Sequence, residues 1–406
     1  MTVTRFTPHK IAIERNELLP QEELLDKAMF FRRLTIGIPN ESSKFENRII
    51  LSPNAVKQLV SEEHTIMIEK GAGERSNWSD DDYKRAGAQI VSKKDIFHAE
   101  IIAKVSPFSK SEIKNLTGNQ TLISSLHSST QTRENIKNLI KKRVTAIAFE
   151  LIKDENDFYP FVHPMSEIAG ILAITTASRY LSNQQAGKGI LLGGVTGISP
   201  TKIVILGAST AAEYAARAAL GLGASVQIFD NSIAKLQQIK GKLGFQISTS
   251  VYQKQIVENN LKSADVVIGA TEFNGTEPEF IVSEKMVENM KPGTIIIDLN
   301  TDNISSFETS KITDFGNPVF EKYEVIHYCV PNIASEASRT ASISLSNALF
   351  PILQKISMQR DTIRIIKDDI SIRKGTYIYE GILTNEHIGK KFNLNYKDIN
   401  LLTAIF

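Results

Sequence analysis

Residues 202–230 read KIVILGASTAAEYAARAALGLGASVQIFD. A run of apolar residues stops at Gly207, an alanine-rich segment with helical spacing follows, and a second apolar run ends at Asp230. This order predicts a strand, a tight turn, a helix and a second strand. The turn follows the spacing G-x-G-x-x-G/A, with Ser209 at the second glycine position and Ala212 at the third. The stretch therefore predicts a βαβ unit of the dinucleotide-binding type.

The small residues of this turn have separate tasks. The first glycine closes the turn, the second lets the backbone approach a pyrophosphate, and the third lets the helix pack on the strand. Gly207 and Ala212 meet the first and third requirements, while Ser209 places a hydroxyl beside the phosphates, where it can hydrogen-bond an oxygen. The helix that begins near Thr210 turns its positive end toward the anion. We therefore predict a dinucleotide site; a turn that binds no nucleotide is the alternative.

Asp230 decides which dinucleotide is expected. It ends the second strand about 20 positions after the turn, where an acidic side chain binds the ribose 2′-hydroxyl. The same carboxylate would repel a 2′-phosphate, so the predicted cofactor is NAD rather than NADP.

The composition is that of an ordinary globular protein. The chain has 406 residues, and its 47 basic and 45 acidic residues leave a net charge of +2, without the basic block that a nucleic-acid partner needs. Cys329 is the one cysteine, so no disulfide forms within the chain. The first residues lack the apolar core of a signal peptide, and the longest weakly charged stretch is interrupted by Glu213 and Arg217. We expect a cytoplasmic protein with no membrane contact and no metal site.

Strand and helix signals alternate along most of the chain. Before the dinucleotide unit, apolar strand candidates stand at 34–39, 65–69, 100–106, 120–127 and 144–150. Segments with helical spacing separate them, and Ser52 before Pro53 is a candidate helix N-cap. This alternation predicts parallel sheets covered by helices, in two α/β halves.

Several motifs together resemble one family. They are 34–56 (LTIGIPNESSKFENRIILSPNAV), 71–91 (GAGERSNWSDDDYKRAGAQIV), 165–170 (MSEIAG), 188–200 (KGILLGGVTGISP), 290–303 (MKPGTIIIDLNTDN) and 327–332 (HYCVPN). These segments resemble the family of alanine dehydrogenase and the nicotinamide nucleotide transhydrogenase alpha subunit, and are most similar to alanine dehydrogenase. The resemblance covers about residues 34–355.

The resemblance implies an α/β fold with two Rossmann-like domains, the nucleotide-binding domain being inserted between two segments of the catalytic domain. It also implies a homo-oligomer, often a hexamer. The boundaries expected here are an N-terminal extension at 1–33, the first catalytic segment at 34–165, the NAD-binding domain at 166–337, and the second catalytic segment with a C-terminal extension at 338–406.

Site residues follow from the same motifs. The resemblance implies that Arg48 binds the substrate carboxylate, as the fork of a guanidinium can do with two hydrogen bonds. It implies that His127 is the acid/base group and that Asp302 orients the amine or the attacking water. Lys104 aligns with the first lysine of the family's KVKEP-like segment and is expected to bind substrate. Ser106 stands where the family has a second, substrate-contacting lysine.

Three further positions match family contacts to the dinucleotide: Ser166, Lys235 and Asn332. Each has a structural alternative that the sequence leaves open. Ser166 could be a helix N-cap, Lys235 a solvated charge on a helix, and Asn332 a turn residue.

The resemblance implies an NAD-dependent L-alanine dehydrogenase that reversibly converts alanine to pyruvate and ammonia. Two alternatives stay open. A transhydrogenase-like hydride-transfer subunit would need a membrane partner and a second nucleotide domain. A catalytically impaired member, acting as a sensor or a structural subunit, is suggested by Ser106 and Ser209.

Overall fold

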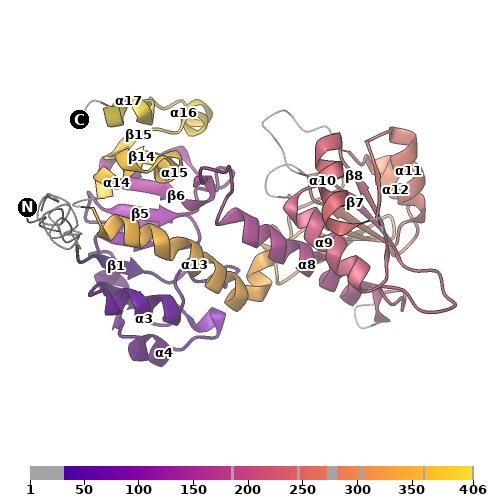
Figure 1. The fold of residues 1–406 in the computed structure, drawn as a ribbon, viewed down its shortest axis with the longest axis horizontal. Helices are drawn as coiled ribbons and strands as arrows, with labels where there is room; N and C mark the ends of the chain where they lie inside the picture. Colours follow the sequence, from indigo (N-terminus) through magenta and orange to yellow (C-terminus); the bar gives the residue numbers. More distant parts are fainter. Residues whose placement is uncertain are drawn as a thin grey trace, which may run out of the picture.

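The structure is a computed structural model that describes residues 32–183, 187–244, 247–271, 281–301, 305–359 and 362–404. The expected N-terminal extension falls almost entirely outside these residues. Within the described ranges the strands form two sheets, one of eight strands and one of seven. Figure 1 shows the two sheets in separate lobes, with long helices running between them.

The first sheet contains the strand candidates that precede the dinucleotide unit. Its spatial order is β15 (Ile382–Leu383), β14 (Thr376–Tyr379), β6 (Thr145–Ala148), β5 (Thr121–Ser124), β4 (Ile101–Ala103), β1 (Thr35–Ile38), β2 (Thr65–Glu69) and β3 (Gln89–Val91). The strands from β6 to β3 are all parallel. Chain order reverses between β1 and β4, and in doubly wound sheets ligands bind at the carboxyl ends of the strands at such a reversal.

Helices cover both faces of this sheet, which is why its central strands are apolar without alternation. They are α3 (Pro53–Ser61), α4 (Asp80–Arg85), α5 (Lys93–Ile96), α6 (Lys110–Asn115) and α7 (Arg133–Lys141), with short turns of 3₁₀ helix at η1 (Glu74–Ser76) and η2 (Phe149–Leu151). The hydroxyl of Ser52 accepts the amide of Ala55 and Pro53 opens α3, so the predicted N-cap is confirmed. We call this sheet with its helices the first lobe.

The C-terminal part of the chain completes the first lobe. Strands β14 and β15 pair antiparallel beyond β6, and α14 (Thr362–Asp368), α15 (Ile370–Gly375), α16 (Glu386–Phe392) and α17 (Ile399–Ala404) surround them. Thr376–Tyr379 is fully buried, although the charged residues around it hide the strand in the sequence. The C-terminal part therefore supplies one edge of the first sheet.

The second sheet is built around the quoted stretch. Its order is β12 (Val319–Lys322), β13 (Val325–Tyr328), β11 (Ile295–Asp298), β10 (Val266–Gly269), β7 (Lys202–Leu206), β8 (Ser225–Phe229) and β9 (Ile247–Ser250). Apart from the antiparallel β12, the pairing is parallel. Read from β9 to β13 this is the doubly wound Rossmann order, with its reversal between β7 and β10.

The helices of the second sheet are α9 (Thr210–Gly221), α10 (Ile233–Leu243), α11 (Lys254–Ser263) and α12 (Glu284–Glu288). We call this sheet with its helices the second lobe. The first sheet shows the same 3-2-1-4-5-6 order, so the expectation of two Rossmann-like domains is confirmed.

Two long helices join the lobes. Helix α8 (Val162–Leu181) leads from the first sheet to the second, and η4 (Ile333–Ala337) with α13 (Ser338–Ser357) leads back (Figure 1). The second lobe is therefore inserted between two segments of the first, as expected. Among the described residues, no helix has the length and apolar character required to cross a bilayer.

Candidate functional site

The predicted site residues gather at the carboxyl ends of the strands. Gly207 follows β7 and Asp230 follows β8 in the second lobe, while Lys104 follows β4 and His127 lies three residues after β5 in the first. Ligands of doubly wound sheets bind at this edge, where the strand order reverses. Each lobe thus contributes one reversal point to the candidate site.

Gly207 closes the dinucleotide turn and could be no other residue. Its φ is +105°, and a Cβ there would lie 2.3 Å from the carbonyl oxygen of Ala270, at the end of the neighbouring β10. A side chain would therefore push apart the two strands that flank the reversal point. The glycine is therefore required by the tight turn and by the close packing of the backbone on β10, which is the task of the first glycine in a dinucleotide turn.

Ser209 has a role that the sequence did not reveal. It is the N-cap of α9, and its hydroxyl accepts the amide of Ala212 at 3.2 Å. Ala212 is fully buried against the sheet, as predicted for the third small position. The serine therefore replaces a glycine without disturbing the helix start, and because its oxygen is the acceptor of the cap bond, its O–H can still donate to a phosphate oxygen.

Asp230 is fixed by two backbone amides. Its Oδ2 accepts from the amide of Ala208 at 2.8 Å, and its Oδ1 accepts from the amide of Ser232 at 2.7 Å. The first bond ties the end of β8 to the dinucleotide turn itself. The carboxylate is thereby held at the position where a ribose hydroxyl is expected.

A network from α8 reaches the same turn. The hydroxyl of Thr210 lies 3.3 Å from Nδ1 of His163, whose Nε2 lies 3.3 Å from a carboxylate oxygen of Glu167. In the same motif, a Cβ on Gly170 would lie 2.3 Å from the carbonyl of Ala211, so this glycine lets α8 cross α9 closely. The glycine of the MSEIAG motif is thus explained by helix packing, and no signal in the sequence pointed to His163 or to Gly170.

The other predicted cofactor residues are placed as follows. Ser166 lies in the second turn of α8, so the alternative that it is an N-cap is wrong. The amide of Lys235 donates to the N-cap hydroxyl of Ser232 at the start of α10. Asn332 follows β13, and its amide nitrogen donates to Oε2 of Glu46 in the first lobe at 2.8 Å.

Arg48 is held by a carboxylate two residues away. Its Nε and Nη2 donate to the two carboxylate oxygens of Glu46 at 2.8 and 2.7 Å, and its Nη1 lies 3.5 Å from the sulfur of Met165. The side chains of Arg48 and Glu46 are only 12% and 5% exposed. This is a buried fork-to-fork ion pair, in which both hydrogen bonds are charge-assisted.

Burial and pairing set the protonation of this pair. Burial alone would raise the pKa of Glu46, but the charge and hydrogen bonds of Arg48, with the amide of Asn332, bring that pKa below its ordinary value. Burial likewise opposes the charge of Arg48, and Glu46 more than offsets it, so the pKa of Arg48 is raised. Both groups are therefore ionised at neutral pH.

Lys104 is fully buried in a second ion pair. Its Nζ lies 2.8 Å from Oε1 of Glu112 and 3.6 Å from Oε2 of Glu41. Glu41 also accepts the amides of Val105 at 2.6 Å and Ser106 at 3.1 Å, and burial raises its pKa. The ammonium of Lys104 thus faces carboxylates on two sides, and its predicted contact with substrate stays a prediction.

His127 stands on a strained, exposed turn after β5. Its φ is +42°, which is uncommon for a residue other than glycine. One oxygen of Glu150 accepts the hydroxyl of Ser125 and the amides of Leu126 and His127, at 3.0, 2.7 and 3.2 Å. Glu150 therefore shapes the loop that presents His127, a role that no local sequence signal indicated.

Asp302 lies outside the described residues. The strand before it, β11, ends at Asp298, which is buried and accepts the hydroxyls of Ser305 and Ser310 at 2.5 and 2.7 Å. The predicted role of Asp302 therefore stays a prediction.

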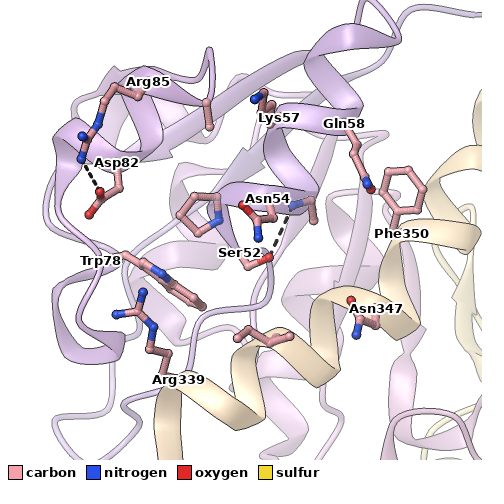
Figure 2. Close-up of a pocket in the computed structure, with 14 residues that line it drawn as sticks. Ser52, Asn54, Lys57, Gln58, Trp78, Asp82, Arg85, Arg339, Asn347 and Phe350 are labelled. Atoms are coloured by element: carbon pink, nitrogen blue, oxygen red, sulfur yellow. Dashed lines mark hydrogen bonds and ion pairs between the residues drawn. The ribbon is translucent and has the colours of Figure 1, made fainter.

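A separate groove of about 710 Å³ lies on the first lobe, between α3, α4 and α13 (Figure 2). The guanidinium of Arg339 stacks over Trp78 there, 5.1 Å from the ring centroid, and Arg85 pairs with Asp82. Among the described residues that line it, none belongs to the predicted site.

These features define a class of protein: a two-lobed doubly wound α/β protein with a dinucleotide-type turn in one lobe and a buried arginine fork in the other. Comparison with known proteins identifies the family within this class. The family model "Alanine dehydrogenase/PNT, N-terminal domain" matches residues 37–169, and "Alanine dehydrogenase/PNT, C-terminal domain" matches residues 173–386.

Relatives with similar sequences bear the name alanine dehydrogenase. The protein of that name from Methanococcus maripaludis is 35% identical over 366 residues, which are 89% of this chain and 98% of that protein. The one from Mycolicibacterium smegmatis is 33% identical over 367 residues, 90% of this chain and 98% of that protein.

Solved structures agree. An L-alanine dehydrogenase superposes with a TM-score of 0.83 at 34% identity, covering 88% of this chain and 99% of that one. A transhydrogenase from Sinorhizobium meliloti has a TM-score of 0.74 at 23% identity, covering 87% and 99%, which shows a shared fold. The chain belongs to the alanine dehydrogenase/PNT family. The resemblance read from the sequence is confirmed, and the family implies an oxidoreductase with a nicotinamide cofactor.

Proposed function

We propose that the protein is an NAD-dependent L-alanine dehydrogenase. It would convert L-alanine, NAD⁺ and water to pyruvate, ammonium, NADH and a proton, and would also run the reverse reaction. The observation that supports the proposal is that Arg48, in the loop after β1, and His127, in the turn after β5, both follow strands of the first sheet, while the second lobe carries a dinucleotide-type turn after β7. The names of the relatives support the same substrate.

The residues of the second lobe fit a nicotinamide dinucleotide. Gly207 closes the tight turn, α9 begins at this turn, and the carboxylate of Asp230 is tied to the turn by the amide of Ala208, from where it would bind the ribose hydroxyls. When bound, the nicotinamide accepts the hydride from the alanine Cα. Thr210, Ser166, Lys235 and Asn332 are proposed as further contacts around it.

In the first lobe, Arg48 would grip the carboxylate of the substrate and so hold the Cα toward the second lobe. His127 would take the proton from the water that adds to the imine carbon, and would return it to the departing ammonia. Asp302 would orient that water or the amine. Lys104 would act through charge from within the fold, because its ammonium is enclosed by Glu112 and Glu41.

The test follows NADH absorbance with pyruvate and ammonium, with NADPH in a parallel cuvette. The proposal expects oxidation of NADH and much slower oxidation of NADPH, because Asp230 would face the 2′-phosphate. His127→Asn should lower kcat by about 10²-fold or more while the Kd for NADH stays near that of the wild type. Equal rates with NADPH would refute the NAD assignment, and full turnover by His127→Asn would refute the acid/base assignment.

One alternative is favoured by a specific observation. Ser106 supplies no cation where the family has a substrate lysine, and its amide is bound to Glu41. A member that binds nucleotide without turnover would follow if Arg48 alone cannot retain the substrate. Binding of NADH without any pyruvate-dependent oxidation would favour this alternative. The proposal also includes a cytoplasmic homo-oligomer, hexameric by resemblance, which light scattering on the purified protein would test.

A further inference from the structure

A guanidinium has two edges that can each donate two parallel hydrogen bonds, and in Arg48 these two edges have different partners. Glu46 occupies the edge made by Nε and Nη2, at 2.8 and 2.7 Å. Among the described residues, the end made by Nη1 and the second proton of Nη2 makes no hydrogen bond to an oxygen or nitrogen atom. The described neighbour of Nη1 is the sulfur of Met165 at 3.5 Å, which is a weak acceptor that a carboxylate would outcompete.

Glu46 is itself held from both lobes. In addition to the side chain of Arg48, its oxygens accept the amide of Arg48 at 3.0 Å, the hydroxyl of Ser335 at 3.2 Å and the amide nitrogen of Asn332 at 2.8 Å. Ser335 and Asn332 belong to the segment that leaves the second lobe, while Glu46 lies in the loop after β1. The carboxylate of Glu46 therefore links Arg48 to the segment that leads from the second lobe back to the first.

We propose that Glu46 is the positioning residue for the substrate carboxylate: it fixes the guanidinium of Arg48 so that the Nη1–Nη2 end faces the site. The proposal rests on the function proposed above. Glu46 acts through Arg48 and does not touch the substrate. Its contact with Asn332 would set this orientation relative to the cofactor lobe.

Geometry, rather than charge, is the reason for this role. The Arg48–Glu46 pair carries no net charge, so an incoming carboxylate gains from two aligned donors rather than from excess positive potential. If bulk charge decided binding, removal of the carboxylate of Glu46 would leave a bare cation and strengthen substrate binding. If alignment decides it, the same change would weaken binding. The two accounts predict KM changes of opposite sign.

The experiment compares Glu46→Gln and Glu46→Asp with the wild type. In Glu46→Gln the amide nitrogen cannot accept from Nη2, so we expect the KM for pyruvate to rise about tenfold or more, with kcat and the Kd for NADH each within about threefold of the wild type. Glu46→Asp keeps the charge but retracts the carboxylate, so its KM for pyruvate should lie between those of the wild type and Glu46→Gln. It also keeps the test available if the glutamine variant does not fold.

A matched control is Asp265→Asn. Asp265 also joins a lysine to a backbone amide, through Lys291 at 3.0 Å and Lys202 at 2.9 Å, but at the amino end of β10, away from the site. Its removal should leave the KM for pyruvate unchanged. Calorimetric titration of pyruvate into protein saturated with NAD⁺ adds a readout that needs no turnover.

The outcomes separate the two proposals. An unchanged or lower KM in Glu46→Gln, in an active wild type, would overturn the role of Glu46 and leave the proposed function standing. A wild type that binds pyruvate without turnover, together with weakened binding in Glu46→Gln, would overturn the proposed function and support Glu46. A wild type that neither binds nor turns over pyruvate would overturn both.

Discussion

The carboxyl edges of the two sheets are stabilised by different kinds of interaction. At the reversal point of the first sheet, Glu41, Glu46, Arg48, Lys104 and Glu112 are buried or nearly buried and satisfy one another. At the reversal point of the second, the turn consists of small residues, and within the described part of the chain Asp230 is fixed by backbone amides rather than by a cation. The first edge depends on paired charges and the second on backbone shape.

The difference shows how a buried charge can stay available to a ligand. Lys104 is 0% exposed and faces carboxylates on both sides, so its charge is balanced by Glu112 and Glu41 within the fold. Arg48 meets the carboxylate of Glu46 along one edge and is 12% exposed; in the proposed function its other end binds the substrate carboxylate. A planar fork can serve structure and recognition together, which a lysine enclosed in this way cannot do.

The largest effect is expected at Arg48. Arg48→Lys would lose the paired donors on both faces, a loss of about 3–4 kcal/mol of transition-state stabilisation, so kcat/KM for pyruvate should fall about 10²–10³-fold. NADH binding, which depends on the other lobe, should change little. Steady-state kinetics with NADH titration by fluorescence would check both. Comparable losses of NADH affinity and of kcat/KM would contradict the assignment of substrate binding to the first lobe and of cofactor binding to the second.

Lys104→Met should act on stability instead. It leaves Glu112 buried without its cation, which costs about 3 kcal/mol of unfolding free energy. The double variant Lys104→Met/Glu112→Gln should recover part of this loss, because no uncompensated buried charge remains. Urea unfolding would measure the cycle. A variant of wild-type stability that had lost pyruvate binding would instead make Lys104 a substrate ligand.

Acid should destabilise the second lobe through His327. Burial lowers the pKa of His327 from 6.5 to about 4, and its ring is bonded to Thr309 and to the carbonyl of Val325. The unfolded chain binds this proton at a higher pH than the folded chain does, so stability is lost as pH falls from 6.5 through 4, by about 2–3 kcal/mol.

The check is the free energy of unfolding measured from pH 7 to pH 4 for the wild type and for His327→Gln. The variant should lose less stability over this range. Identical slopes would show that His327 does not contribute. Glu46, whose pKa is lowered, should contribute its own loss only below its ordinary value of 4.5, so the two lobes lose stability over different pH ranges.

Gly207→Ala tests the carboxyl edge of the second sheet, where the turn depends on backbone shape. The alanine would adopt φ +105° with its Cβ 2.3 Å from a carbonyl oxygen, so the Kd for NADH should rise about 30-fold, for a cost near 2 kcal/mol. Gly221→Ala is the matched control, because nothing lies within 4 Å of its added Cβ. Unchanged NADH binding in Gly207→Ala would contradict the assignment of this turn.

The smallest effect is expected at Ser209. Ser209→Gly should cost only a few tenths of a kcal/mol of stability and improve NADH affinity at most about threefold, whereas Ser209→Ala should cost about 1 kcal/mol by loss of the N-cap. Thermal unfolding of the two variants would separate them. Equal stability of the alanine variant and the wild type would show that the cap is not needed.

Much of the fold could be predicted because its signals are local. The apolar run before Gly207, the spacing to Asp230 and the N-cap at Ser52 are each read within a few residues, and each appears in the structure as expected. Strand β14 was missed because its pairing with β6 joins residues more than 200 positions apart, and charged neighbours conceal it.

The candidate site was only partly predictable for a related reason. Family motifs point to Arg48 and His127, but their supporting carboxylates have no periodic pattern around them: Glu46 lies in an irregular loop and Glu150 in the short 3₁₀ helix η2. Lys104 illustrates the reverse case: its alignment suggested a ligand, while its pairing with Glu112 depends on how α6 packs behind β4. Contacts of this kind are fixed by tertiary packing, which spacing in the sequence does not encode.

The most direct measurement is the rate of NADH oxidation by the purified protein with pyruvate and ammonium, each supplied alone and then together. An NAD-dependent alanine dehydrogenase oxidises NADH only when both are present, and the product is L-alanine. NADH loss that ignores ammonium would indicate another reaction. No loss under any condition, with NADH bound, would contradict the proposed activity.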